Sequence, residues 1–234
     1  MRDSQIPLGY EVIKLAGDAH YRLIARLSCS VGDLNVFDPD DLTEAQVKLT
    51  KKMHVFCEWK EIIEDNKPII QELTGIENLM YQKEPYLRIA RPFNFEDNIG
   101  IHRDTHYGAT KDEWVLWVPL TQATDGAELR ILPESHLRDD EYYPWVYKDS
   151  DVKKGSDKHW LGFRYRPKVM ELETESKCLP ISCRVGEAIL FNCACVHGQK
   201  VNKAPWTRFS IDIRLTDRDA NVQRNRGLHG DLYV

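Results

Sequence analysis

The sequence predicts a mainly β chain against which a small number of helices pack. Three segments alternate apolar and polar residues with a period of two, which is typical of strands with one buried face: residues 86–91, 127–132 and 207–215. A further segment, 114–120, is almost entirely apolar and rich in β-prone residues. This pattern indicates a strand that is buried on both faces, as in the middle of a layered β structure.

Helical patterns are confined to the N-terminal third. Apolar residues recur at helical spacing over 42–64, after an acidic turn at 38–41 that suits the start of a helix. We expect a shorter helix over 18–27 and a strand over 10–15. Pro68 is expected to begin a further turn or short helix.

Strand patterns resume late in the chain, after an irregular segment. A glycine turn and an apolar run over 183–191 predict another strand. The preceding residues 137–177 are rich in charged and aromatic side chains, and insertions of this length are often functional lids. We expect this insertion to cover the substrate, with Arg164 and Arg166 as candidates for clamping an anionic or sugar-like molecule.

No internal repeat, low-complexity tract or linker divides the 234 residues, so we expect a single domain. Its parts would be an N-terminal helical region over about 1–80, a β core over about 81–215, the insertion at 137–177 and a tail at 216–234. The tail either packs as an arm or remains mobile.

Composition excludes several classes of partner. The net charge is −5, the pI is near 5.9, and no long basic run occurs, which argues against a nucleic-acid partner. No apolar stretch approaches the length of a membrane span, and the N-terminus lacks the apolar core of a signal peptide. We therefore expect a cytoplasmic protein that does not bind membranes.

The cysteines are expected to be reduced thiols, because the sequence offers no sign of export to an oxidising compartment. There are six: Cys29, Cys57, Cys178, Cys183, Cys193 and Cys195. A zinc site is the minor interpretation, since the C-x-C pair at 193–195 has no second cysteine pair of matching spacing.

One short motif carries the chemistry, the His-x-Asp pair formed by His102 and Asp104. Residues two apart on a strand project from the same face, so an imidazole nitrogen and a carboxylate oxygen would lie together. A third metal ligand has to come from elsewhere in the chain, and His197, followed by Gly198, is the best candidate. Two histidines and one carboxylate on one side of a metal leave three positions open, which suits non-haem Fe(II) that reacts with O2.

The order of the motifs resembles that of a known family. The series is His102-x-Asp104, Trp117-Val118-Pro119-Leu120, Gly126-x-x-Leu129-x-x-x-Pro133-Glu134-Ser135-His136, His197-Gly198, and Asn202 followed by Arg208. It resembles the Fe(II)/2-oxoglutarate-dependent oxygenases, and within them the phytanoyl-CoA hydroxylase-like group. That group typically has glycine where this chain has Glu134. The resemblance covers roughly residues 81–215.

The resemblance implies a double-stranded β-helix, a cupin-like jelly roll with helices packed on one sheet. It also implies that His102, Asp104 and His197 bind iron, that Arg208 holds the distal carboxylate of 2-oxoglutarate, and that Ser210 adds a hydroxyl to the same carboxylate. Related halogenases replace the carboxylate ligand with a small residue. The presence of Asp104 therefore favours hydroxylation or desaturation over halogenation.

The implied function is a 2-oxoglutarate-dependent hydroxylase that acts on a small molecule of a carbohydrate or natural-product pathway. Its cofactors would be Fe(II), 2-oxoglutarate and O2, and its co-products succinate and CO2. Two alternatives remain: a catalytically silent jelly roll that binds a ligand, and another cupin-type metalloenzyme that does not use 2-oxoglutarate. The sequence leaves the oligomeric state open.

Several other polar residues could belong to the site or to the scaffold. His106 is interpreted either as a substrate contact or as a residue beyond the metal, and His136 as a structural hydrogen-bonding group that closes its turn. Arg88 and Arg91 fall on opposite faces of their strand, so one of them could reach the site. Arg214 would either extend the polar interior or pair with an acid.

Overall fold

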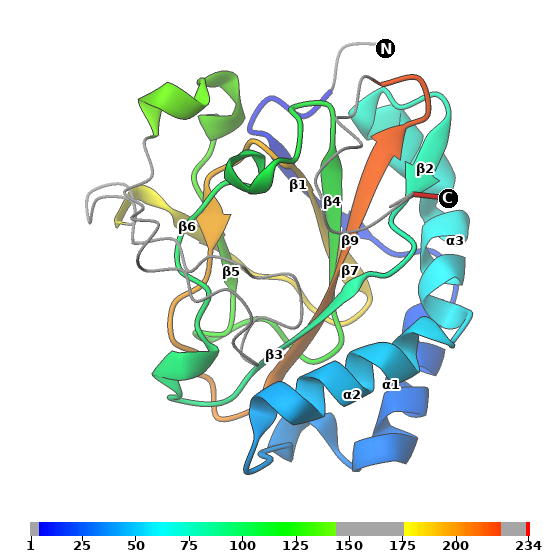
Figure 1. The fold of residues 1–234 in the computed structure, drawn as a ribbon, viewed down its shortest axis with the longest axis vertical. Helices are drawn as coiled ribbons and strands as arrows, with labels where there is room; N and C mark the ends of the chain where they lie inside the picture. The colour runs from blue at the N-terminus through cyan, green and yellow to red at the C-terminus, as the bar shows by residue number, and fades with distance from the viewer. Residues whose placement is uncertain (1–4, 144–175, 221–232) are drawn as a thin grey trace.

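Two antiparallel sheets face each other, and helices cover the outer face of the larger one (Figure 1). The computed structural model describes residues 5–143, 176–220 and 233–234. The larger sheet has the order β1-β7-β4-β9-β2, with β3 also paired to β9; its strands are β1 (Tyr10–Lys14), β2 (Leu79–Tyr81), β3 (Tyr86–Ala90), β4 (Trp114–Pro119), β7 (Glu187–Asn192) and β9 (Arg208–Asp217). The smaller sheet has the order β6-β5-β8, from Leu179–Ile181, Leu129–Ile131 and His197–Gly198.

Helices and short 3-10 turns complete the described chain. The helices are α1 (Ala19–Val31), α2 (Leu42–His54) and α3 (Glu58–Thr74), and the 3-10 turns are η1 (Leu34–Val36), η2 (Phe95–Asp97), η3 (Asp104–Tyr107), η4 (Ser135–Leu137) and η5 (Asp140–Tyr142). Within the ranges that the structure describes, every helix is too short or too polar to cross a membrane.

Strand β4 lies between two hydrophobic cores, as its nearly continuous apolar sequence predicts. Trp114, Leu116 and Val118 belong to the core that the helices share with the larger sheet. Val115 and Trp117 point the other way and pack in the core between the two sheets. Side chains of one strand alternate between its faces, so a strand with a core on each side has to be apolar throughout.

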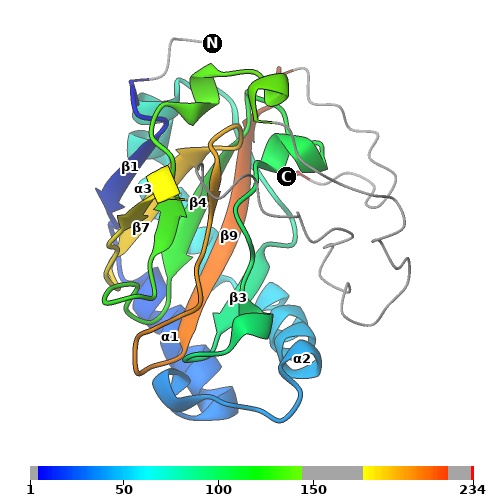
Figure 2. The same cartoon turned by 90° about the vertical axis from the view of Figure 1, so that its left-hand side faces the viewer.

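One face of strand β9 packs in the hydrophobic core, and the other faces the pocket. Phe209, Ile211, Ile213 and Leu215 are fully buried in the helix-side core. The alternate residues, Arg208, Ser210, Asp212 and Arg214, share the opposite face, which looks into the space between the sheets. Figure 2 shows β9 between β3 and β4; β3 pairs with residues 208–212 of β9, and β4 pairs with residues 210–215. The alternation predicted over 207–215 is thereby confirmed.

The single helix expected over 42–64 is wrong, because two helices occupy this region. Helix α2 begins at Leu42 and ends at His54. Its N-cap is Asp41, whose side chain accepts a hydrogen bond from the amide of Glu44 at 2.9 Å. Helix α3 then continues through Pro68 to Thr74 and ends at Gly75 in the left-handed conformation. Pro68 therefore lies inside a helix and does not begin a new one. Burial of one apolar face of α3 outweighs the hydrogen bond that proline removes.

The cysteines are free thiols, as expected, and four of them are buried. Burial raises the pKa of Cys195 to about 12 and that of Cys193 well above its ordinary value, so both remain protonated at neutral pH. The insertion predicted over 137–177 is described at its two ends alone; residues 144–175, including Arg164 and Arg166, lie outside the described residues. Of the tail, Tyr233 forms an antiparallel bridge with Gln82.

Glu134, which stands where the related group has glycine, adopts a left-handed backbone conformation with φ of 60° and ψ of 2°. A residue with a Cβ atom is strained there, by roughly 1 kcal/mol, while glycine is not. We expect Glu134→Gly to raise the free energy of unfolding by about 0.5–1 kcal/mol, measured by urea denaturation.

The matched control is Glu141→Gly, at another exposed glutamate whose φ is not positive. The added backbone freedom should destabilise this variant by up to about 1 kcal/mol. Equal destabilisation by both substitutions would show that the left-handed conformation at residue 134 stores no strain.

Candidate metal centre and active site

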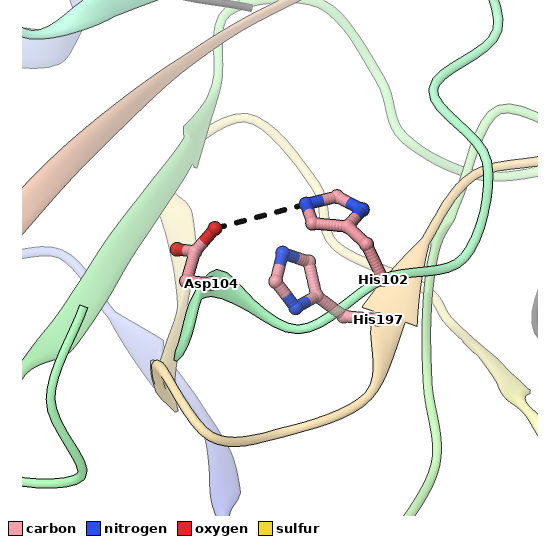
Figure 3. Close-up of side chains that lie close together, drawn as sticks. All are labelled: His102, Asp104 and His197. Atoms are coloured by element: carbon pink, nitrogen blue, oxygen red, sulfur yellow. Dashed lines mark ion pairs between the residues drawn. The ribbon is translucent and has the colours of Figure 1, made fainter. Parts of the chain in front are cut away.

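Three buried side chains converge between the two sheets. His102, Asp104 and His197 each offer one ligand atom, and these atoms lie within 4.8 Å of one another. Figure 3 shows the two imidazole rings and the carboxylate pointing into one common space. The Nε2 atom of His102 lies 3.7 Å from the Oδ1 atom of Asp104. The residues singled out by motif spacing are thus brought together.

The backbone of two distant segments sets this convergence. The amide of His102 donates to the carbonyl of His197 at 2.7 Å, and the amide of His197 donates back to His102 at 2.8 Å. The amide of Asp104 donates to the carbonyl of Cys193 at 3.0 Å, which aligns the rest of the two segments. Each peptide bond is rigid, so three such hydrogen bonds fix where the side chains start.

The expectation that His102 and Asp104 belong to one strand is wrong. His102 forms an isolated bridge to His197, and Asp104 begins the 3-10 turn η3. Arg103 between them is nevertheless extended, with φ of −121° and ψ of 140°. The two side chains therefore project to the same side, as residues two apart do on a strand, although the chain turns directly after Asp104.

Gly198 permits the close approach of these segments. A Cβ atom at this position would lie 2.8 Å from the carbonyl oxygen of Gly100 and 2.8 Å from the Cα atom of Ile101. Both are backbone atoms that cannot move aside without displacing the adjacent His102. The glycine of the His-Gly motif therefore has a steric origin.

Backbone carbonyls orient both imidazoles. The Nδ1 atom of His102 lies 2.8 Å from the carbonyl oxygen of Gly100, and the Nδ1 atom of His197 lies 2.9 Å from that of Cys195. A carbonyl oxygen can only accept, so each Nδ1 carries the proton and each Nε2 presents its lone pair toward the cluster. This is the arrangement that histidine ligands of metals adopt in proteins.

The electrostatics favour the protonation states that a metal requires. Burial, together with the neighbouring His102, lowers the pKa of His197 to about 4, so His197 is neutral at pH 7. Burial alone would raise the pKa of Asp104, but the charge of Arg214, together with the two neighbouring histidines, holds it well below its usual range. A neutral imidazole and an ionised carboxylate are the forms that bind divalent cations.

Arg103 holds the two ligand-bearing segments together from behind. Its side chain is fully buried, its Nε atom donates to the carbonyl of Ala194 at 2.7 Å, and a terminal nitrogen donates to that of Arg138 at 2.9 Å. The guanidinium also pairs with Asp140 at 2.9 Å. No sequence pattern marks this role, because a basic residue beside a motif is ordinarily a surface charge.

Arg208 lies in the same pocket as the three ligands, which is also lined by Trp117 and Gln199. It is buried, with its guanidinium carbon 5.7 Å from the centre of the Trp117 ring, and it donates to the side-chain oxygen of Gln199. Burial lowers its pKa to about 10, so it stays charged at neutral pH. Its Nε atom and the hydroxyl of Ser210 have no partner among the described residues, although Ser210 itself does not line the pocket.

The remaining candidates divide between pocket and scaffold. Arg88 lines the pocket and pairs with Asp212 at 2.6 Å, while Arg91 pairs with Asp97 at 2.9 Å outside it. For Arg214 the sequence left two alternatives, a place in the polar interior or a pair with an acid, and both are correct. Arg214 lines the pocket and pairs with the candidate ligand Asp104.

Two histidines do not line the pocket. His106 lies on η3, so the strand face that it was expected to share with His102 does not exist. His136 does not close its turn, because its Nδ1 atom has no partner among the described residues. The turn is closed by Ser135, whose hydroxyl donates to Leu132 at 2.6 Å and accepts from the amide of Val196 at 2.8 Å.

The lowered pKa of His197 predicts a pH dependence of stability. Between about pH 6.5 and 4 the unfolded chain takes up a proton at this histidine and the folded chain does not, so stability falls as the pH falls through this window. Urea denaturation with a chelator present should therefore give a shallower pH slope for His197→Gln, by up to about 1.4 kcal/mol per pH unit. Parallel slopes for the two proteins would contradict this assignment.

Comparison with known proteins identifies the fold. No curated protein sequence matches this chain. EvdO2 from Micromonospora carbonacea var. aurantiaca, solved in complex with 2-oxoglutarate, is similar over 93% of this chain and 89% of its own, with 13% identity and a TM-score of 0.64. The non-haem monooxygenase ThoJ covers 90% and 75%, with 16% identity and a TM-score of 0.59.

A third similar structure is SnoK, a non-haem α-ketoglutarate-dependent carbocyclase from nogalamycin biosynthesis, which covers 97% of this chain and 91% of its own at 16% identity and a TM-score of 0.56. These likenesses give this chain the jelly-roll fold that the motif order implies, with helices packed on one sheet. The family model described as phytanoyl-CoA dioxygenase (PhyH) matches residues 40–210. Because this match spans well over half of the sequence, the chain belongs to the phytanoyl-CoA dioxygenase family of non-haem iron, 2-oxoglutarate-dependent oxygenases.

Proposed function

We propose that this oxygenase hydroxylates a small molecule, with Fe(II) held by His102, Asp104 and His197 and with 2-oxoglutarate anchored by Arg208. The observation that carries the proposal is the convergence of three buried ligand atoms within 4.8 Å in a pocket that also contains a buried arginine. A three-ligand cluster or a buried arginine alone is common. A pocket that contains both can bind a divalent metal and a dicarboxylate side by side.

The donor set fits iron. Two imidazole nitrogens and one carboxylate oxygen on one side of an ion leave adjacent positions for a chelating keto acid and O2. Carbonyls of Gly100 and Cys195 orient the imidazoles, and this fixes the ligands before the ion arrives. When bound, the iron supplies the oxidising chemistry that converts 2-oxoglutarate to succinate and CO2 as a substrate C–H bond is hydroxylated.

Arg208 fits the distal carboxylate of 2-oxoglutarate. A guanidinium is planar and permanently charged, and it offers paired N–H groups that match a carboxylate. Trp117 supports one face of the group, and Gln199 accepts from one terminal nitrogen, which holds the fork in place. Within the described part of the chain, the Nε atom of Arg208 and the hydroxyl of Ser210 have no hydrogen-bond partner, so both can donate to an anion.

The substrate is proposed to be a small molecule of a natural-product or carbohydrate pathway. Apolar and aromatic side chains line the pocket around the polar groups, among them Val115, Leu129 and Phe191. Such a lining suits a compact organic substrate. Among proteins of this fold, SnoN has been solved in complex with Fe³⁺, α-ketoglutarate and nogalamycin RO. The preference for a pathway type rests on this likeness of fold.

Succinate formation tests the proposed activity. Protein supplied with Fe(II), ascorbate, 2-oxoglutarate and O2 should release succinate, slowly alone and faster with a substrate from a small-molecule library. Asp104→Ala should remove the activity, because it deletes the one anionic ligand. Arg22→Gln, on the exposed face of α1, is the matched control and should retain it. Tight metal binding without succinate release under any condition would favour a silent binding protein.

Arg208 distinguishes this activity from a metalloenzyme that does not use 2-oxoglutarate. Arg208→Gln should weaken 2-oxoglutarate binding by at least about 30-fold, since loss of one partner of a buried charge pair costs about 2 kcal/mol or more. Mn(II) affinity should stay within about threefold of the wild type, and titration calorimetry under argon measures both. Unchanged 2-oxoglutarate affinity would favour the other metalloenzyme class.

A further inference from the structure

We infer that Arg214 forms a binding site for a single anionic group of the substrate, on the side of the metal ligands opposite Arg208. The inference rests on the proposed function, since it presumes that the metal and 2-oxoglutarate occupy the positions described above. It adds a chemical class of substrate: a small molecule with one carboxylate, sulfonate or phosphodiester group.

Arg214 reaches directly to the metal-binding cluster. One of its terminal nitrogens lies 3.3 Å from the Oδ1 atom of Asp104, and its side chain is 24% exposed, toward the pocket that it lines. Asp104 is the one ion-pair partner that the described residues give it. Arg214 therefore shares its carboxylate partner with the candidate metal site.

Arg208 and Arg214 serve different ends of the pocket. They lie six residues apart on β9, which corresponds to about 20 Å along an extended strand. Their partners do not overlap: Arg208 contacts Gln199, Ala127 and the Trp117 ring, whereas Arg214 contacts Asp104. A five-carbon dicarboxylate that is held at Arg208 therefore leaves Arg214 available for a second molecule.

The charges of the described pocket residues do not balance once the cofactors are bound. Three arginines, Arg88, Arg208 and Arg214, face two aspartates, Asp104 and Asp212, which leaves one positive charge. The divalent metal and the dianion of 2-oxoglutarate cancel each other, and histidine ligands are neutral. Arg88 has Asp212 at 2.6 Å, and Arg208 would have 2-oxoglutarate. The uncompensated charge falls on Arg214.

Metal binding itself creates the need for an anion. Asp104 donates electron density to the metal when it becomes a ligand, so its oxygens accept less strongly from Arg214. An arginine cannot discard its proton at neutral pH, and a buried cation without a counter-charge is costly. A monoanionic substrate group placed against the guanidinium restores the balance. The carbon skeleton would then lie beside Val115 and Phe191, close to the metal.

Methanesulfonate is a suitable probe, because it is a monoanion that coordinates metals weakly. The protein is loaded with Mn(II) and 2-oxoglutarate under argon, and the proton relaxation of the probe methyl group is measured by NMR during titration. Wild-type protein should enhance this relaxation saturably, since Mn(II) acts over short distances. Dimethyl sulfone, the neutral molecule of matched shape, should show at least about tenfold weaker binding.

Substitutions assign the effect to Arg214. Arg214→Gln should lower methanesulfonate affinity at least about tenfold, and Arg214→Lys, which keeps the charge, should lower it less. Arg22→Gln, an exposed arginine of α1, is the control and should match the wild type. Circular dichroism and calorimetric titration with Mn(II) and 2-oxoglutarate verify that each variant is folded and loaded.

Two results would overturn the inference. If the loaded wild-type protein binds methanesulfonate no better than dimethyl sulfone, the pocket has no anion site. If Arg214→Gln binds methanesulfonate normally but loses Mn(II) affinity, Arg214 is a positioning residue for Asp104. Failure of the proposed function gives a different outcome, in which the wild-type protein does not bind Mn(II) or 2-oxoglutarate at all.

Discussion

The pair of reciprocal peptide hydrogen bonds between His102 and His197 is the constraint on which the rest of this site depends. It joins two segments that are far apart in the sequence, and it does so at the residues that carry the imidazoles. Arg103 and Gly198 then act on the same junction, one by holding it from behind and the other by allowing the backbones to approach. The ligand geometry is therefore a property of backbone pairing, and the side chains need few further contacts to hold it.

Strand β9 links the stability of the scaffold to the chemistry of the pocket. Its apolar residues complete the core beneath the helices, and its polar residues face the ligands. Because the two sets alternate, a register shift of one residue would exchange them and bury the arginines among aliphatic side chains. Pairing with β4 on one side and with β3 and β2 on the other fixes the register. The spacing of Arg208 and Arg214 along the pocket is thereby fixed as well.

Local patterns predicted β1, β3, β4, β5, β7 and β9 and the identity of the candidate ligands, but not the short strands β2, β6 and β8 or how the ligands meet. The period-two segments became β3, β5 and β9, since burial of one face dominates their sequences. The helix over 42–64 was mispredicted because a single break at Val55–Cys57 leaves the apolar periodicity nearly unchanged. Three features of the site depend on residues distant in the chain: the position of the turn at Asp104, the hydrogen bonds of Arg103 to Ala194 and Arg138, and the contact of Arg214 with Asp104. Such contacts have no signature in a window of ten or twenty residues.

The two sheets differ greatly in size, so we expect them to differ in how easily they unfold locally. His197 belongs to a sheet whose strands have two or three residues each, whereas Arg208 and Arg214 belong to the ten-residue β9 of the larger sheet. Short strands with few interstrand hydrogen bonds open locally at low free-energy cost. An ion held by His102, Asp104 and His197 would tie this small sheet to the segment that enters η3. Loss of that ion would therefore expose the small sheet to proteases before the helices and the larger sheet unfold.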